Sequence, residues 1–281
     1  MIAVLVIGAG LLVPLSLFPA SLSVLENAVI LIAALGATVI MTRTVNKKPV
    51  SAVGLGFHHE TFKDLGAGAL LGFLMMTGIY LIVVALGYSV TTGRGLSTGD
   101  AVWVVAGGLA WFASGALGEE ILFRGYPFQT LVQAVTLLPA MLLMAVVFTA
   151  AHAQNPHMTF LSALNVALAG ILFSIAYVKT RSLWLPFGIH WGWNFCQTTL
   201  FGFPGSGIAP GSHALVITET TGPAWITGGD FGPEGGVLAT LALVIATWYV
   251  LKATYLIAPE GIITLDSVED LIGPRNGKGA Q

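Results

Sequence analysis

Residues 101–124 read AVWVVAGGLAWFASGALGEEILFR, and this stretch decides what kind of fold the chain can have. Its first 18 residues carry no charge, and the last six contain Glu119, Glu120 and Arg124. About 20 mostly apolar residues are enough for an α-helix to cross a lipid bilayer. The stretch therefore predicts a transmembrane helix with three ionisable side chains near one end. Such side chains are costly in lipid and usually mark function.

The rest of the chain is similarly apolar. Of its 281 residues, 56% are hydrophobic and 9% are charged, against about 25% charged residues in soluble domains. Continuous apolar runs favour helices over the alternating segments of a β-barrel. We predict an all-α, polytopic transmembrane helical bundle of about eight spans, a single membrane domain over 1–281 with a flexible C-terminal tail at about 259–281. The candidate spans are 2–20, 24–42, 66–88, 101–126, 136–152, 159–178, 183–200 and 236–257.

Basic residues between the spans predict the orientation. When eight spans are threaded, the loops on one side carry only Arg94, and the longest of them, 201–235, has no Lys or Arg. We expect the other side, and with it both termini, to be cytoplasmic. No basic patch suggests a nucleic-acid partner, so the lipid bilayer is the expected surrounding. The basic side carries Arg43, Lys47, Lys48, Lys63, Lys179, Arg181, Arg275 and Lys278.

Glu119, Glu120 and Arg124 form the first of three polar clusters within the apolar spans. On a helix, Glu120 and Arg124 lie one turn apart and can pair, whereas Glu119 points about 100° away. The two acids can therefore have different roles, one held in the structure and the other free for chemistry. Taken alone, the cluster could also be a salt-bridged helix end at the membrane interface.

The other two clusters are Phe148 with His152 and His190 with Asn194, and residues four apart share one helix face. A lone histidine at a helix end can be an interfacial residue, and His190 and Asn194 can serve helix–helix hydrogen bonding. Together, the three clusters supply a carboxylate base, two imidazoles and an amide. These groups suffice to activate a water and to stabilise an oxyanion. The sequence contains neither G-x-S-x-G nor H-E-x-x-H.

In this order and on separate spans, the motifs resemble those of the CPBP family, the CAAX-processing and bacteriocin-processing intramembrane proteases, also called Abi or Rce1-like. The motifs are Glu-Glu-x-x-x-Arg at 119–124, Phe-x-x-x-His at 148–152 and His-x-x-x-Asn at 190–194. The resemblance covers about 100–200 and implies a CAAX-protease-like catalytic core there. It gives supporting roles to Glu120, Arg124 and Phe148.

The resemblance also implies catalytic roles for four residues. Glu119 would be the general base that activates water, assisted by His152, while His190 and Asn194 would form the oxyanion hole. The family has been described both as metalloproteases and as metal-free, glutamate-dependent proteases. The expected cofactor is therefore none, which we favour, or a single divalent metal such as zinc. For a metal, the candidate ligands are Glu119, His152 and His190.

The implied function is that of an intramembrane endopeptidase of a prokaryotic cell membrane. It would hydrolyse a peptide bond in a membrane-anchored or prenylated peptide or protein substrate. Two other functions stay open at this point. One is a proton-coupled membrane transporter, since buried Glu, His and Arg also serve proton relays, although the sequence has no visible inverted repeat. The other is a non-catalytic bacteriocin-immunity protein on the same fold.

Two expectations concern the geometry. At about 1.5 Å per residue, Glu119 and His190 come to similar depths, but His152 lies too far along its helix. We therefore expect 136–152 to be tilted or not to span simply, and the site to open toward the cytoplasmic half through a water-filled cavity. Loop 201–235 is an irregular loop or a lid over the site. Three of its residues could bind a metal or substrate, namely His213, Asp230 and Glu234.

Overall fold

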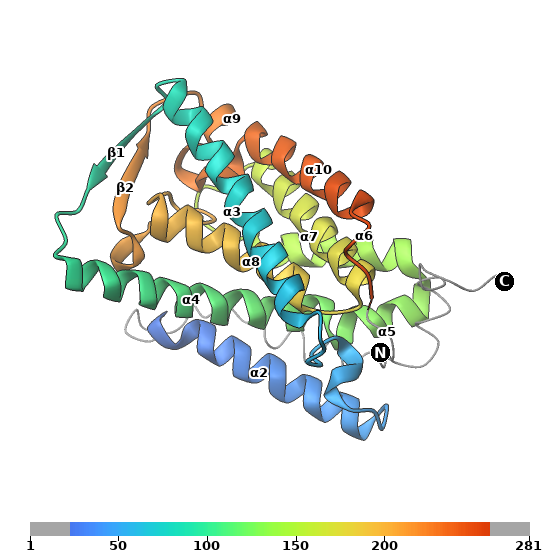
Figure 1. The fold of residues 1–281 in the computed structure, drawn as a ribbon. Helices are drawn as coiled ribbons and strands as arrows, with labels where there is room; N and C mark the ends of the chain where they lie inside the picture. The colour runs from blue at the N-terminus through green and yellow to red at the C-terminus, as the bar shows by residue number, and fades with distance from the viewer. Residues whose placement is uncertain (1–22, 259–281) are drawn as a thin grey trace.

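The computed structural model describes residues 23–258 of the chain. The expected first span at 2–20 and the expected tail at 259–281 lie outside the described residues. Within them, each expected span contains a helix, which confirms an all-α membrane bundle. The helices, shown in Figure 1, are α2 (Ser23–Thr44), α3 (Thr61–Ala85), α4 (Thr98–Arg124), α5 (Tyr126–Val135), α6 (Leu137–His152), α7 (Phe160–Thr180), α8 (Trp184–Asn194), α9 (Ala224–Thr227) and α10 (Val237–Lys252).

Four helical stretches are long and apolar enough to cross a membrane, judged by length and composition. They are Asn27–Thr44, Thr61–Ala85, Thr98–Val135 and Phe160–Thr180. Two shorter apolar helices, α6 and α10, accompany them. The outer faces of these helices expose large apolar side chains such as Ile32, Trp103 and Trp248, as expected of surfaces that contact lipid.

Helix α4 and the shorter α5 follow each other with a break at Gly125, and the sequence analysis did not predict α5 as a separate helix. Ser97 caps the start of α4 by accepting a hydrogen bond from the backbone N–H of Asp100 at 3.1 Å. At the break, a Cβ on Gly125 would lie 2.4 Å from the carbonyl oxygen of Ile121, so the chain can turn there only with glycine. Pro127 then opens α5, as proline does in the first turn of a helix.

Helix α8 lies in the interior, in contact with α3, α4 and α7 (Figure 1). Its contact with α3 brings two backbones together at Gly68 and Gly72 of α3 and Gly188 and Gly192 of α8. A Cβ on any of these four glycines would lie 2.3–2.4 Å from a backbone carbonyl oxygen of the other helix. Both pairs are four residues apart, the small-residue spacing that permits close helix packing in membranes. His190 lies between the two glycines of α8, so this contact fixes the depth of the imidazole.

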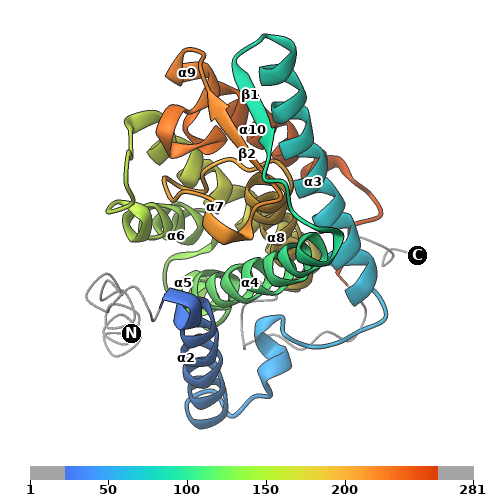
Figure 2. The same ribbon diagram turned by 90° about the vertical axis from the view of Figure 1, so that its left-hand side faces the viewer.

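A two-stranded antiparallel sheet adds to the all-α bundle. Strand β1 (Ser89–Gly93) follows α3, and β2 (Val216–Thr220) lies within loop 201–235. The hydroxyl groups of Thr91 and Thr218 hydrogen-bond across the pair at 2.8 Å. In Figure 2 the two strands lie side by side at one end of the bundle, together with α9. Loop 201–235 is therefore folded onto the helices and not an extended excursion from them.

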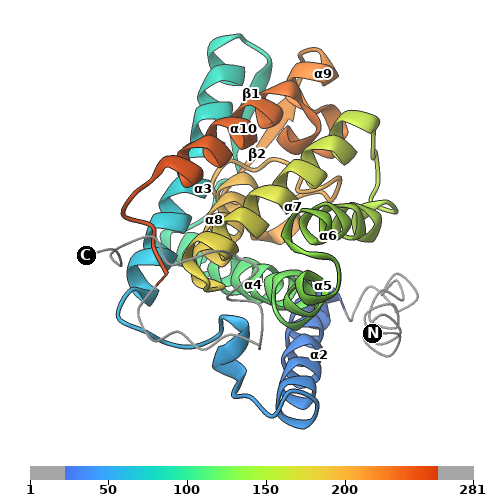
Figure 3. The ribbon, with the colours of Figure 1, turned by 90° about the vertical axis from the view of Figure 1, so that its right-hand side faces the viewer.

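Helices α5 and α6 lie at the opposite end of α4, on the side that faces the viewer in Figure 3. With 16 residues, α6 is shorter than the roughly 20 residues that a span needs. That segment 136–152 is tilted or spans the bilayer only in part stays a prediction. The helix ends at His152, whose Nε2 lies 4.0 Å from Oε2 of Glu119.

The contact between α3 and α8 can be tested with one alanine. We expect Gly72→Ala to lower the apparent Tm of the purified protein, because its Cβ would lie 2.3 Å from the carbonyl oxygen of Ile189. Overpacking of this kind costs about 1–3 kcal/mol. The control is Gly78→Ala on the same helix, where a Cβ meets nothing within 4 Å and the Tm should be unchanged or slightly raised. Equal Tm values for both variants would contradict the close packing of the two backbones.

Candidate active site

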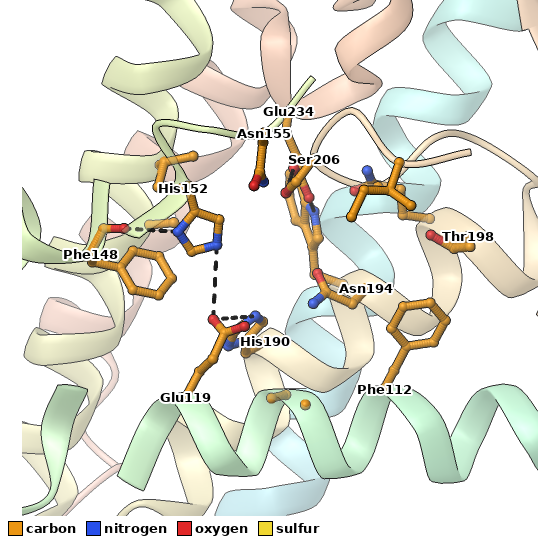
Figure 4. A pocket seen from close by; sticks show the side chains of 18 of the residues that line it. Phe112, Glu119, Phe148, His152, Asn155, His190, Asn194, Thr198, Ser206 and Glu234 are labelled. Carbon is orange, nitrogen blue, oxygen red and sulfur yellow. Dashed lines mark hydrogen bonds and ion pairs between the residues drawn. The ribbon is translucent and has the colours of Figure 1, made fainter. Parts of the chain in front are cut away.

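A cavity of about 630 Å³ lies between the helices, and side chains from all three sequence motifs reach it. Its walls come from α2, α4, α6, α7, α8 and α10, and residues of loop 201–235 cover it. Figure 4 shows Glu119 rising from α4, with His152 and His190 converging on its carboxylate. The motif residues that line the cavity are Glu119, Phe148, His152, His190 and Asn194.

The Glu119 carboxylate lies between the two imidazoles. Its Oε2 is 4.0 Å from Nε2 of His152 and 3.9 Å from Nε2 of His190. This oxygen is buried and has no hydrogen-bond partner among the described residues. Polar atoms separated by more than about 3.5 Å are too far apart to bond directly, but they can share a bridging water. The arrangement therefore suits a water held between a carboxylate and an imidazole.

Glu120 points away from the cavity into the packed interior, as its position on the helix predicts. Its Oε1 accepts a hydrogen bond from the Arg124 guanidinium at 3.2 Å, and both side chains are fully buried. Arg124 also donates to the carbonyl oxygen of Gly170 at 3.2 Å. The ring of Phe148 lies 4.5 Å from the guanidinium carbon, close enough for a cation–π contact. The two adjacent acids thus have different surroundings, one facing the cavity and one buried in an ion pair.

Hydrogen bonds fix the orientation of both imidazoles. Nδ1 of His152 lies 2.8 Å from the carbonyl oxygen of Phe148, which can only accept, so Nδ1 donates and Nε2 is the free acceptor of the neutral ring. Nδ1 of His190 lies 2.9 Å from Oε1 of Glu120, the same oxygen that binds Arg124. The ring of His190 also stacks on Phe173 with centroids 4.9 Å apart. Both Nε2 atoms are consequently directed toward Glu119.

Asn194 lies one turn beyond His190 and also lines the cavity. Its side-chain amide makes no hydrogen bond within the part of the chain that the structure describes, so it is available to a ligand. Directly after Asn194 the chain forms a π-helical turn over Phe195–Leu200, which the sequence analysis had not predicted. Such turns interrupt α-helices frequently at functional sites. Here the turn directs Gln197 and Thr198 to the same cavity.

The three candidate metal ligands come together in the cavity. Ligands held at 2.0–2.1 Å around a tetrahedral zinc lie roughly 3.4 Å from one another. The distances from Oε2 of Glu119 to the two Nε2 atoms are somewhat longer, 3.9 and 4.0 Å. One carboxylate and two imidazoles are a donor set that zinc accepts, so these three side chains are the ones that would hold a metal ion.

Loop 201–235 forms the cover of the cavity. His213 stacks on Trp111 of α4 with ring centroids 5.1 Å apart and an interplanar angle of 16°. Burial lowers the pKa of His213, so its ring is neutral near pH 7. Of the loop residues singled out from the sequence, His213 and Glu234 line the cavity. Asp230 does not; its side chain is 85% exposed and lies 4.0 Å from His157.

The direction in which the cavity extends is given by its lining. The residues that line the cavity run from Glu119 along α8 to loop 201–235. Among the described residues, no lining residue comes from the basic connections at 45–60 and 181–183. The lining thus extends toward loop 201–235, whereas the side to which the cavity opens in the membrane stays a prediction. Polar side chains continue from His190 and Asn194 of α8 to Gln197 of the π-helical turn, and the loop folds over that end.

Sequence reasoning missed several lining residues. Gln197 comes seven residues after His190 and three after Asn194. This helical spacing would have predicted that it lies on the same face. Asn165 was a visible amide within an apolar run; it binds the backbone carbonyls of Glu234 and Gly236 at 2.7 and 2.9 Å. Nothing in the sequence indicated a role for Trp111, because a single tryptophan in an apolar segment cannot be distinguished from a residue that only packs against its neighbours.

The different surroundings of the two acids predict different effects on stability. Glu120→Ala removes the partner of a fully buried guanidinium, and breaking a buried pair costs about 3–5 kcal/mol. We expect a large fall in the Tm of the purified protein. Glu119→Ala is the matched control, since this carboxylate faces the cavity, and it should leave the Tm nearly unchanged. A larger loss for Glu119→Ala than for Glu120→Ala would contradict this division.

Comparison with known families bears on the segment that carries these residues. Residues 101–196, about a third of the chain, match the model of the family described as Rce1-like, type II CAAX prenyl endopeptidases. The matched segment contains all three motifs, from Glu119 to Asn194. No curated protein matches the chain. The resemblance seen in the motifs is thereby confirmed: residues 101–196 of this integral membrane protein are similar to the Rce1-like family of CAAX prenyl endopeptidases.

Proposed function

We propose that this protein is an intramembrane endopeptidase that hydrolyses a peptide bond in a membrane-anchored peptide or protein. The observation that carries the proposal is the meeting of one carboxylate oxygen with two imidazole Nε2 atoms, at 3.9 and 4.0 Å, in a cavity enclosed by apolar helices. The family description adds prenylated peptides as the substrate class to be tried first.

The first step is the activation of water. A water between Glu119 and His152 donates one hydrogen bond to Oε2 of Glu119 and the other to the free Nε2 of His152. As its oxygen attacks the peptide carbonyl carbon, a proton passes to Glu119 and the carbonyl oxygen becomes an oxyanion. When the C–N bond breaks, Glu119 returns this proton to the leaving amine. The carboxylate is thus regenerated, and one water is consumed for each bond cleaved.

The oxyanion would be stabilised by Asn194 and His190. The Asn194 amide supplies an N–H that is not engaged elsewhere among the described residues. With Nδ1 of His190 bound to Glu120, its Nε2 can donate to the oxyanion when the ring carries two protons. The charges support this form, because the carboxylates of Glu119 and Glu120 against the single guanidinium of Arg124 leave one negative charge for an imidazolium to balance.

The membrane topology is part of the same proposal. We infer a single multi-pass domain of about eight spans in a prokaryotic cell membrane, with the catalytic core at about 100–200 and both termini cytoplasmic. The distribution of Lys and Arg between the spans supports this orientation. In it, β1, β2 and loop 201–235 lie on the side opposite the cytoplasm.

Cleavage of a lipidated, fluorogenic peptide by the purified protein in nanodiscs tests the proposal. We expect Glu119→Gln and His152→Ala to lower kcat/KM by about 10²-fold or more, since general base catalysis is worth about 10²–10⁴. His190→Ala and Asn194→Ala should lower kcat by about 10²–10³ through the loss of oxyanion donors. The control is His59→Ala, whose side chain is 72% exposed outside the cavity. Full activity in Glu119→Gln would refute the assignment, and no cleavage by the wild type would favour a non-catalytic protein.

Removal of metal distinguishes a metal-free mechanism, in which Glu119 activates the water, from a zinc-dependent one. The spacing of Glu119, His152 and His190 suits a bridged water, so we expect activity to survive prolonged treatment with EDTA. Elemental analysis of the active protein should then find far less than one metal ion per chain. Loss of activity that added zinc restores would instead assign these three side chains as metal ligands.

A further inference from the structure

The end of the cavity distant from Glu119 contains a second carboxylate, that of Glu234, which the proposed mechanism does not use. Figure 4 shows Glu234 near Ser206 and Asn155, on the far side of the cavity from Glu119. Its Oε1 accepts a hydrogen bond from Nε1 of Trp193 at 3.2 Å, and its Oε2 accepts one from the hydroxyl of Ser206 at 2.5 Å. Both donors are uncharged, so they orient the carboxylate without neutralising it.

Gln197 provides a second, independent acceptor at this end. Its side chain is completely buried, and its Nε2 donates to the carbonyl oxygen of Pro204 at 2.7 Å. This bond fixes the orientation of the amide and leaves Oε1 without a hydrogen-bond partner among the described residues. Buried acceptors are normally paired, so an unpaired one on a residue that lines the cavity points to a donor supplied by a ligand.

The backbone around Ser206 is held in an unusual conformation. Ser206 has a φ of +47°, in the left-handed region that residues other than glycine seldom adopt. Strained residues of this kind concentrate at ligand-binding sites, where the surrounding structure maintains them. Here the conformation accompanies the contact of the Ser206 hydroxyl with Glu234.

No lysine or arginine in the described lining of the cavity is available to balance Glu234. None of the described lining residues is Lys or Arg. Arg124 lies behind the wall and is bound to Glu120 and to the Gly170 carbonyl, and Arg94 binds the carbonyl oxygens of Ser212 and Ala214 at the surface. The titratable lining residues are Glu119, His152, His190, His213 and Glu234.

We propose that Glu234, Ser206 and the Oε1 atom of Gln197 form a cation subsite that receives a lysine or arginine side chain of the substrate peptide. This inference rests on the proposed protease function and specifies its substrate. The subsite offers acceptors and a negative charge, which an ammonium or guanidinium group complements with charge-assisted hydrogen bonds. A free C-terminal carboxylate of a substrate in the same place would be repelled by the carboxylate of Glu234, because no lysine or arginine of the described lining lies beside it.

The distance along α8 and the π-helical turn that follows it gives the position of this basic residue in the substrate. Gln197 follows His190 by seven residues, which corresponds to roughly 10 Å along a helix axis. An extended peptide advances about 3.3 Å per residue, so the side chain in the subsite belongs to a residue about three positions from the scissile bond. The subsite thus recognises an amino-acid side chain near the scissile bond and not the lipid anchor of the substrate.

The test uses two matched lipidated peptides that differ at one position, lysine against the uncharged isostere norleucine, placed in turn three residues to either side of the scissile bond. We expect the wild type to favour the lysine peptide by about tenfold in kcat/KM at one of the two positions. Glu234→Gln preserves the shape of the side chain and should abolish this preference, so that the lysine and norleucine peptides are cleaved with equal kcat/KM. Glu219→Gln, an exposed acid of the same loop outside the cavity, is the control and should keep the preference.

Binding provides a readout that does not depend on catalysis. Fluorescence anisotropy with the Glu119→Gln protein should show tighter binding of the lysine peptide, and the further change Glu234→Gln should remove the difference. Equal binding and equal cleavage of both peptides by proteins with Glu234 intact would overturn the subsite and leave the protease proposal standing. Selective binding without any cleavage by the wild type would support the subsite and refute the protease.

Discussion

The arrangement of the site depends on one interaction, the ion pair between Glu120 and Arg124 in the interior of the bundle. Both side chains are fully buried, and a guanidinium in such a place cannot remain unpaired. Arg124 therefore commits Glu120 to a structural position, and Glu120 in turn binds Nδ1 of His190 at 2.9 Å. Because successive residues of a helix point about 100° apart, the neighbouring Glu119 is directed to the cavity instead.

The ion pair alone would not bring His190 to the correct depth. That depends on α8, an interior helix that approaches α3 closely enough for backbone to touch backbone at Gly72 and Gly188. His152 is the last residue of α6 and presents its imidazole at the same level as His190, with Nε2 4.0 Å from Oε2 of Glu119. Three helices of different length thus present their functional groups at one level, and the packing between them, more than any single bond, maintains the distances near 4 Å.

The sequence predicted the bundle and the convergence of the motif residues because both follow from simple constraints. Long apolar runs must be helices in lipid, and spacings of four residues place Phe148 with His152 and His190 with Asn194 on one face. The break at Gly125 and the π-helical turn after Asn194 could not be predicted in this way, since both depend on tertiary contacts. The extension of the cavity toward loop 201–235 could not be predicted either, because it depends on how this loop folds back over the helices.

That loop is better regarded as part of the site than as a connection between helices. Trp193 of α8 and Ser206 of the loop donate to the same carboxylate, that of Glu234, and Asn165 of α7 donates to the backbone carbonyl oxygens of Glu234 and Gly236. The loop is therefore attached to the helices by polar contacts at the cavity itself. A ligand that enters the cavity must lie against these groups, so the loop that covers the cavity also presents a carboxylate to that ligand. In the proposed protease, the contacts that enclose the cavity would therefore also select the substrate.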